Sequence, residues 1–227
     1  MLCIDVSSSM RQRDMDPTRT RLDVARDAAL AFVARRPDDR IGLVAFARHP
    51  DVRCPPTLDH AALSELLKRI EPVEADGPED ATGLGVAVAR AARMLESSRS
   101  SARVALLLTD GEENVALGQS EDEIAPFAAA QLCASRGVRV DAIVVGGATV
   151  DTAPLRRVTE RSRGRFFAAQ DAGAVEAVLA SIDRLERSPL EEPRFRMRDA
   201  AEAWLAAALA LFCGGRFLRA TAWRVAP

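Results

Sequence analysis

The fold of this 227-residue chain is read most directly from VALLLTDG, residues 104–111. Five consecutive apolar residues leave no polar face, which is typical of a strand buried on both sides near the centre of a parallel sheet. The polar triplet TDG then ends the strand and begins a loop. Parallel strands need long crossover connections, so the flanking sequence should contain helices.

Short apolar runs alternate with helical patterns on both sides of this strand. Further strands are predicted at residues 2–6, 41–46, 138–145 and 165–168, with 49–54 as a short antiparallel edge strand. Helices are predicted at residues 22–35, 59–70, 82–95, 124–135, 155–162 and 175–185, with Asp59 as an N-cap and Gly137 as a C-terminal stop. This order predicts an α/β fold: a doubly wound, Rossmann-like, mostly parallel sheet with helices on both faces, plus a C-terminal apolar helix.

Composition excludes several classes of function. The 31 basic and 33 acidic residues give a net charge of -2, so no basic surplus points to nucleic acid. The four cysteines are far apart, with no C-x-x-C pair, and we expect them to be small buried hydrophobes rather than zinc ligands. The only histidines, His49 and His60, lie in unrelated contexts, which leaves Ser-His-Asp or Cys-His catalysis poorly supplied.

The predicted domain ends before the C-terminus. Residues 1–187 carry the alternating pattern, 188–199 form a charged, proline-containing linker, and 219–227 form a basic tail. Between them, residues 200–218 are 19 mostly apolar positions, nearly enough for a bilayer core of about 30 Å, and are a candidate transmembrane helix. The alternative is a short Ala-rich helix packed on the domain or on a partner. Basic residues flank both sides of this segment, so the charge rule does not fix its orientation.

Three polar loops should meet at the carboxyl edge of the sheet, where open parallel sheets bind ligands. The first loop carries Asp5, Ser7 and Ser9, whose i, i+2, i+4 spacing lets them face one centre. The second begins a helix at Thr82, and the third contains Asp110. Hydroxyl and carboxylate oxygens make a shell suited to Mg²⁺ (or Mn²⁺). If the hydroxyls bind directly and the carboxylates act through water, the metal stays electrophilic and attracts a partner's carboxylate.

The residues next to these loops form a predicted partner-binding rim: Met10, Glu112, Glu113 and Asn114. Two other readings of the loops remain open. In one, Ser7 and Ser9 only cap a helix and Asp110 only ends a strand. In the other, the fold is kept in a metal-free descendant, because a fold does not guarantee a function.

The D-x-S-x-S of residues 5–9, the downstream Thr82 and the T-D-G of residues 109–111 resemble the metal-ion-dependent adhesion site of von Willebrand factor A domains. The resemblance implies direct metal ligation by Ser7, Ser9 and Thr82, and mainly water-mediated contact by Asp5 and Asp110. It covers about residues 1–187. Further stretches look like the bacterial aerotolerance (Bat-type) branch: MRQRD at 10–14, Pro17 with RL at 21–22, DRIGLVAFA at 39–47 and CPPTLD at 54–59.

The sequence departs from that branch at three places. Ser8 replaces the usual Gly, and its side chain is expected to face away from the metal. Four residues, 78–81, separate Asp76-Gly77 from Thr82, which adds Glu79 and Asp80 beside the site, where they can repel an acidic ligand or add selectivity. Family members usually have membrane-spanning sequence before the first strand, whereas Met1 stands four residues before Asp5.

We therefore expect a membrane-tethered protein-protein interaction module in the bacterial cell membrane, with the A domain extracytoplasmic. By resemblance, its partners are other A-domain proteins and a MoxR-type AAA+ ATPase. The alternative is a soluble A-domain subunit of a chelatase-like AAA+ assembly. No catalysis is expected. Aspartyl-phosphate phosphotransferases need a second Asp where Ser7 stands, and no phosphate-binding G-x-x-x-x-G-K-S/T loop occurs.

Overall fold

The computed structural model describes residues 1–96, 98, 102–111, 114–115, 124–146, 151–185 and 209–216. Contacts divide the chain into two units, Met1–Leu190 and Glu191–Pro227. The first unit contains the sheet and its helices, and the second contains the short helix at 209–216.

One sheet runs through the first unit, and its described part has six strands in the order β3-β2-β1-β4-β5-β6. The strands are β1 (Leu2–Asp5), β2 (Ile41–Phe46), β3 (Pro50–Thr57), β4 (Val104–Thr109), β5 (Arg139–Val145) and β6 (Phe166–Ala169). Among these, only β3 is antiparallel to its neighbour. The central place predicted for the VALLL strand and the antiparallel edge strand are both confirmed, although β3 extends to Thr57 rather than ending at Cys54.

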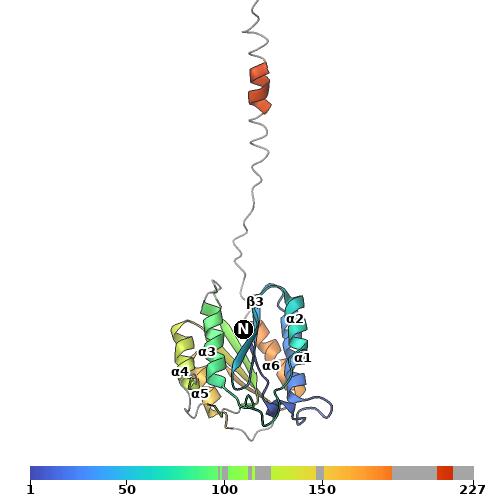
Figure 1. The fold of residues 1–227 in the computed structure, drawn as a ribbon, viewed down its shortest axis with the longest axis vertical. Helices are drawn as coiled ribbons and strands as arrows, with labels where there is room; N and C mark the ends of the chain where they lie inside the picture. The colour runs from blue at the N-terminus through green and yellow to red at the C-terminus, as the bar shows by residue number, and fades with distance from the viewer. Residues whose placement is uncertain are drawn as a thin grey trace, which may run out of the picture. The chain divides into compact units, whose positions relative to one another are not determined.

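Helices cover both faces of this sheet. They are α1 (Arg21–Ala34), α2 (His60–Lys68), α3 (Leu84–Glu96), α4 (Pro126–Ser135), α5 (Ala153–Arg161) and α6 (Ala172–Leu185), with a short 3-10 turn, η1 (Ser8–Arg11). One core lies between the sheet and α1, α2 and α6, and a second lies between the sheet and α3, α4 and α5 (Figure 1). Alternate residues of β1 enter opposite cores, Leu2 and Ile4 the first and Cys3 the second.

Local sequence fixes where several helices begin and end. Thr20 and Asp23 form a capping box at the start of α1. The Thr20 hydroxyl accepts a hydrogen bond from the Asp23 amide, and the Asp23 carboxylate accepts one from the Thr20 amide. Asp59 caps α2 by accepting from the amide of Ala62 at 2.9 Å, as predicted. Gly137, at φ +66°, follows the end of α4 in the left-handed conformation that glycine tolerates.

Strand order reverses beside β1, which lies between β2 and β4. The chain leaves β1 toward α1 on one face, and it leaves β4 toward α4 on the other. The two loops therefore diverge at the carboxyl edge of the sheet, the place where such folds bind ligands. The metal loops inferred from the sequence lie at this reversal.

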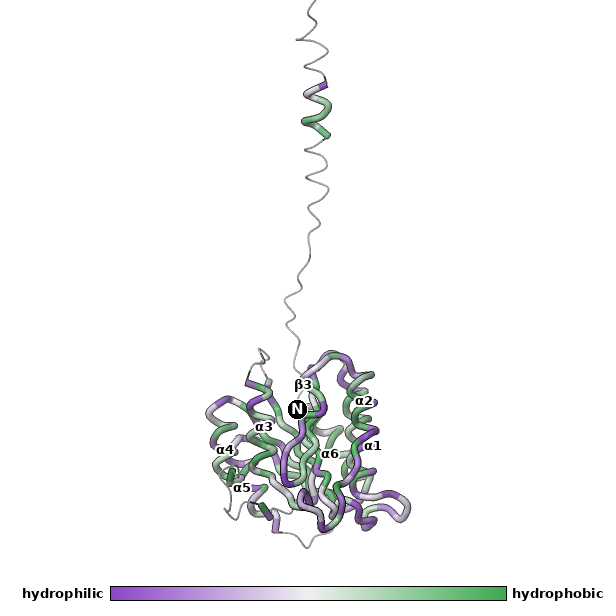
Figure 2. The backbone as a smooth tube through the Cα atoms, in the orientation of Figure 1, coloured by the Kyte–Doolittle hydropathy of each residue, from purple (hydrophilic) through white to green (hydrophobic). Residues whose placement is uncertain are grey.

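The short helix at 209–216 is mostly apolar (Figure 2). Its Leu209, Leu211 and Phe212 are exposed. Within the described ranges, no helix is both long and apolar enough to cross a bilayer. Most of the candidate span at 200–218 lies outside those ranges, as do the linker at 188–199 and the tail at 219–227. The longer C-terminal apolar helix therefore stays a prediction.

Candidate metal centre

The loop that leaves β1 gathers three oxygen-bearing side chains. Asp5 is fully buried, and its Oδ1 accepts hydrogen bonds from the amide and the hydroxyl of Ser7 at 2.9 and 2.7 Å. The hydroxyls of Ser7 and Ser9 lie 3.0 Å apart. The structure thus brings Asp5, Ser7 and Ser9 together on one side of the loop.

The end of β4 completes the surroundings of Asp5. Ile4 pairs with Leu108, so the next residues along the two strands, Asp5 and Thr109, lie side by side. The hydroxyl of Thr109 donates to Asp5 Oδ2 at 2.6 Å. With Ser7 on one carboxylate oxygen and Thr109 on the other, the orientation of Asp5 is fixed from two strands. Sequence reasoning used Thr109 only as part of a motif and missed this contact.

The electrostatics of this cluster suit a cation. Burial first, and then the negative charge of Asp110, raise the pKa of Asp5 to about 7, although hydrogen bonds from Ser7 and Thr109 act in the opposite direction. Both carboxylates are almost wholly buried, with Asp5 0% and Asp110 2% exposed. A bound divalent cation offsets this burial and repulsion, and hydroxyl and carboxylate oxygens are ligands that Mg²⁺ accepts. The residues present therefore fit a divalent metal.

Arg21 brings a fixed positive charge to the same place. Its Nη1 donates to Asp110 Oδ2 at 3.2 Å, while Nε and Nη2 donate to the carboxylate of Asp14 at 2.8 and 2.6 Å. These carboxylates, that of Asp14 first, raise the pKa of Arg21 above its usual range. Gly146 makes room for the guanidinium, since a Cβ there would lie 2.5 Å from Arg21 Nε.

Sequence reasoning did not find the role of Arg21, although a signal existed. Arg21 is the first residue of α1. The positive end of the helix dipole disfavours a basic residue in the first turn. An arginine at that position therefore indicates an acidic partner elsewhere in the fold.

The segment that carries Thr82 is held by its backbone. Thr82 is 1% exposed, and its amide donates to Asn114 Oδ1 at 2.6 Å, while the Asn114 amide donates back to the Thr82 carbonyl at 3.4 Å. The amide of Gly83 donates to the carbonyl of Ala47 at 2.8 Å. The start of α3 is therefore tied to the loops after β2 and β4, which brings Thr82 to the edge of the sheet that carries Asp5.

The extra residues before Thr82 support the metal loop instead of only adding charge beside it. Asp80 Oδ1 accepts from the amide of Ser8 at 3.0 Å, and Oδ2 accepts from the amide of Asp76 at 2.8 Å. The hydrogen bond from the Ser8 amide is the largest cause that lowers the pKa of Asp80. Glu79 pairs with His49 at 3.0 Å. The carboxylate of Asp80 is thus used to fix the loop between Ser7 and Ser9.

The predicted rim needs one correction. Met10 is fully buried, because η1 turns its side chain into the core beside α1. It does not lie on the rim. Asn114 is exposed, but its side chain accepts from the amide of Thr82. Glu112 and Glu113 lie outside the described residues.

The donor set is unlike that of a zinc or calcium cage. Across the parts of the chain that the structure describes, no three His, Cys, Asp or Glu side chains cluster as metal ligands would. The hydroxyls of Ser7 and Ser9 lie beside the carboxylate of Asp5, so a cation held there would be bound partly by uncharged oxygens. Such an arrangement is suited to capturing a further anionic ligand.

Comparison with known families gives a match over the metal loops. Residues 1–113 match the family model described as the von Willebrand factor type A domain, which confirms that resemblance. A UPF0353 protein of Mycolicibacterium paratuberculosis is 30% identical to the chain over 204 residues. The alignment covers 81% of this chain and 59% of that relative. The chain thus spans about three fifths of the length of this curated relative.

Solved structures share the fold. The conserved hypothetical protein BatB of Bacteroides thetaiotaomicron superposes with a TM-score of 0.67 at 19% identity, covering 82% of this chain and 98% of that one. An aerotolerance-related membrane protein of Bacteroides fragilis gives 0.66 at 20% identity, covering 81% and 97%. Proximal thread matrix protein 1 of the mussel byssus, with a zinc-occupied MIDAS motif, gives 0.61 at 17% identity, covering 81% and 44%.

Proposed function

Because this chain carries a von Willebrand factor type A domain, we propose that it is a metal-dependent protein-protein interaction module that captures an acidic side chain of a partner. One observation carries the proposal. The hydroxyls of Ser7 and Ser9 lie 3.0 Å apart beside the buried carboxylate of Asp5, at the reversal of strand order.

In this proposal Ser7, Ser9 and Thr82 hold the cation directly, and Asp5 and Asp110 hold it through water. When bound, the cation supplies an open position for a carboxylate. Thr109 and Arg21 orient the two aspartates by the contacts described above. We propose Mg²⁺ or Mn²⁺ as the metal. The zinc in the adhesion motif of the mussel protein supports a divalent cation in general.

Calorimetric titration of Mg²⁺ and Mn²⁺ into the full chain tests the site. We expect saturable binding that Ser9→Ala/Asp110→Ala abolishes. The control Asp38→Ala/Ser135→Ala removes the same groups from exposed positions elsewhere and should bind normally. If the folded chain takes up no metal even with a short Glu-containing peptide present, the proposal is wrong. Equal binding by the Ser9→Ala/Asp110→Ala variant would also contradict it.

We also propose that residues 200–218 tether the domain to the membrane, with the domain outside the cytoplasm. The support is the apolar segment itself and the fold shared with a protein described as a membrane protein. Membrane association should resist carbonate extraction and be lost on truncation after Ser188. A full-length protein found wholly in the soluble fraction would contradict the tether but not the metal site.

The proposed partners are other A-domain proteins and a MoxR-type AAA+ ATPase. Each candidate should co-purify with the chain in Mg²⁺ and be released by EDTA. The Ser9→Ala/Asp110→Ala variant should not retain it, whereas Asp38→Ala/Ser135→Ala should. Retention that is insensitive to both EDTA and the first variant would contradict capture through the metal.

A further inference from the structure

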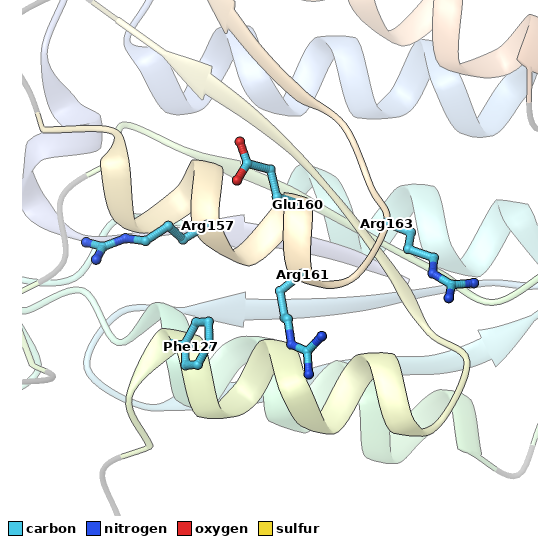
Figure 3. Close-up of a pocket in the computed structure, with 5 residues that line it drawn as sticks. All are labelled: Phe127, Arg157, Glu160, Arg161 and Arg163. Atoms are coloured by element: carbon cyan, nitrogen blue, oxygen red, sulfur yellow. The ribbon is translucent and has the colours of Figure 1, made fainter.

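A hollow lies between α4 and α5, and none of the residues that line it belongs to the metal centre. It is an open hollow of about 370 Å³, lined by Phe127 from α4 and by Arg157, Glu160, Arg161 and Arg163 from α5 and the turn after it. Figure 3 shows Arg161 reaching toward α4, while the carboxylate of Glu160 points away from Phe127. We call these five residues the α4–α5 surface.

The charge of this surface is strongly positive although the whole chain carries a net charge of -2. Arg157, Arg161 and Arg163 are exposed. No carboxylate in the described part of the chain forms an ion pair with any of the three. Arginine guanidinium groups bind carboxylates through paired hydrogen bonds, so the surface offers several such sites to an external ligand.

Helix stability alone explains only one of these arginines. Arg161 lies in the last turn of α5, where a basic residue is favoured by the helix dipole. Arg157 lies in the middle of the helix. Arg163 adopts a φ of +61°, a left-handed conformation that favours glycine, while the Gly164 amide donates to the Thr159 carbonyl at 2.7 Å to close the helix end. Arginine at that position lowers stability and adds positive charge to the hollow.

The hollow also offers an apolar contact. Phe127 is 51% exposed, which is unusual for a large aromatic side chain in a soluble domain. Ile124, just before the same helix, is 36% exposed. Aromatic and arginine side chains are both enriched in protein interfaces, and this hollow has an exposed aromatic with arginines among its lining residues.

We propose that the α4–α5 surface binds an acidic peptide segment of a partner protein, with carboxylates on Arg157 and Arg161 and an apolar side chain against Phe127. Nucleic acid fits less well. Binding to a phosphate backbone draws on many basic contacts, whereas this surface has three arginines on an acidic chain. The surface acts independently of metal, so it goes beyond the function proposed above.

The test uses the full chain in EDTA, so that the metal centre cannot contribute. The probe is a short fluorescent peptide in which Glu residues flank Phe and Leu, followed by anisotropy. A peptide with Gln in place of every Glu is the control. The Glu peptide should bind, with an affinity that falls as salt is raised, and the Gln peptide should not. Absence of binding by the Glu peptide, or equal binding by both peptides, overturns the proposal.

Variants locate the binding. Arg157→Ala/Arg161→Ala should weaken the Glu peptide about tenfold or more. The control Arg35→Ala/Arg40→Ala removes the same charge from exposed positions beyond α1 and should have little effect. A further Glu peptide has Ser in place of Phe and Leu. Phe127→Ser should weaken the binding of the original peptide more than it weakens the binding of this Ser peptide. Equal loss in the two double variants overturns the proposal.

Arg163→Gly separates binding from folding. Glycine relieves the left-handed backbone, so thermal stability should rise while affinity for the Glu peptide falls. A variant that merely damaged the fold would lose both. Unchanged binding of the Glu peptide in both Arg163→Gly and Arg157→Ala/Arg161→Ala overturns the proposal. Tighter binding of short duplex DNA or anionic vesicles through the same arginines overturns it as well.

Discussion

At the scale of single residues, Arg21 joins parts of the chain that are far apart in sequence. Its guanidinium reaches Asp14 in the loop before α1 and Asp110 after β4. The Arg21 and Asp110 side chains are only 8% and 1% exposed. In such surroundings the loss of one partner leaves the other charge buried without compensation. The pair therefore matters for both the fold and the metal loops.

Arg21→Ala should lower the free energy of unfolding by about 3–5 kcal/mol, measured by urea denaturation in EDTA. Arg21→Lys keeps the charge but lacks the forked guanidinium that reaches two carboxylates. It should therefore lower the free energy of unfolding by less than Arg21→Ala does. The matched control is Arg19→Ala, which breaks a more exposed pair with Asp16. It should cost much less. A loss in Arg21→Ala no greater than in Arg19→Ala would contradict the buried role.

Asp5 gives the site a pH dependence. Its pKa is raised to about 7, so the folded, metal-free protein holds this proton more tightly than the unfolded chain. That contribution to stability is fully present below the usual carboxyl pKa and is lost as the pH rises through about 7. A bound cation needs the ionised carboxylate instead. The affinity for Mg²⁺ should therefore rise about tenfold per pH unit below the Asp5 pKa and level off above it.

Calorimetry across this range, in buffers of different ionisation enthalpy, should count about one proton released per metal bound below the Asp5 pKa. Asp5→Asn cannot titrate, so the pH dependence of its metal-free stability in this window should be flatter. An affinity for Mg²⁺ that does not change with pH there would show that Asp5 is already ionised.

The sequence predicted that Asp5, Ser7 and Ser9 lie together, but it did not predict most of the contacts that hold the site in place. Asp5 and Ser7 could be grouped from their i, i+2 spacing, whereas Ser9 reaches the same place through the 3-10 turn at Ser8–Arg11 and not through the extended loop that was predicted. The contacts of Thr109, Arg21 and Asp80 could not be predicted, since each depends on the register or loop packing of segments distant in the chain. The place of Met10 was wrong for a different, local reason: a 3-10 turn replaced the extended loop.

At the scale of elements, α3 and the start of α4 touch through Gly85. A Cβ at Gly85 would lie 1.7 Å from the carbonyl oxygen of Ile124. A Cβ at Gly83 would lie 2.5 Å from the carbonyl oxygen of Arg48, so both glycines of the pair allow a close approach of backbone.

Gly85→Ala should lower the free energy of unfolding by more than about 2 kcal/mol, because either backbone must move. Gly173→Ala is the control: it lies in α6, and its new Cβ would meet only Asp171 Oδ1, at 3.3 Å. That change should be neutral or slightly stabilising. Thermal denaturation of the two variants side by side decides the point, and similar melting temperatures would contradict the close approach.

The loop before α3 is a second element whose role can be tested. Asp80→Ala removes the acceptor for the Ser8 and Asp76 amides, which should cost about 1 kcal/mol and weaken Mg²⁺ binding by loosening the β1 loop. Glu79→Ala, which breaks only an exposed contact with His49, should leave metal binding close to that of the native chain. Tighter metal binding in Asp80→Ala would mean that its charge opposes the ligand instead.

Most elements were predictable because their signals are local. The buried VALLL run, the Asp59 cap and the Gly137 stop each act within a few residues, and the structure has all three where they were predicted. Boundaries were less certain. β3 is longer than expected because Pro55 and Pro56 are tolerated on an edge strand, where fewer amides must pair.

At the scale of the whole molecule, the reactivity of the cysteines shows whether the two cores stay inaccessible to solvent. Cys3, Cys54 and Cys133 are buried, as expected, whereas Cys213 is exposed, which corrects the expectation for the fourth. Burial raises the pKa of Cys3 to about 12 and that of Cys133 to about 11. Both thiols are therefore protonated and shielded in the folded protein.

In the Cys213→Ser chain, no thiol should react rapidly with a chromogenic disulfide under native conditions, and three should react after unfolding in urea. The unchanged chain in aqueous buffer should show one fast thiol. A fast thiol in Cys213→Ser would indicate that one of the two cores opens locally. Adding Mg²⁺ should slow the reaction of the buried thiols, since a ligand that binds only the folded state stabilises it.

The direction of the chain through the sheet also has a mechanical consequence. The metal loops lie at the carboxyl edge of β1 and β4, whereas α6 starts after the carboxyl end of β6 and runs back toward the opposite edge (Figure 1). A partner pulling at the loops against whatever holds the chain beyond α6 therefore pulls along the strands. The hydrogen bonds on both sides of β1, to β2 and to β4, would then be loaded in shear and would resist such a pull together instead of opening one after another.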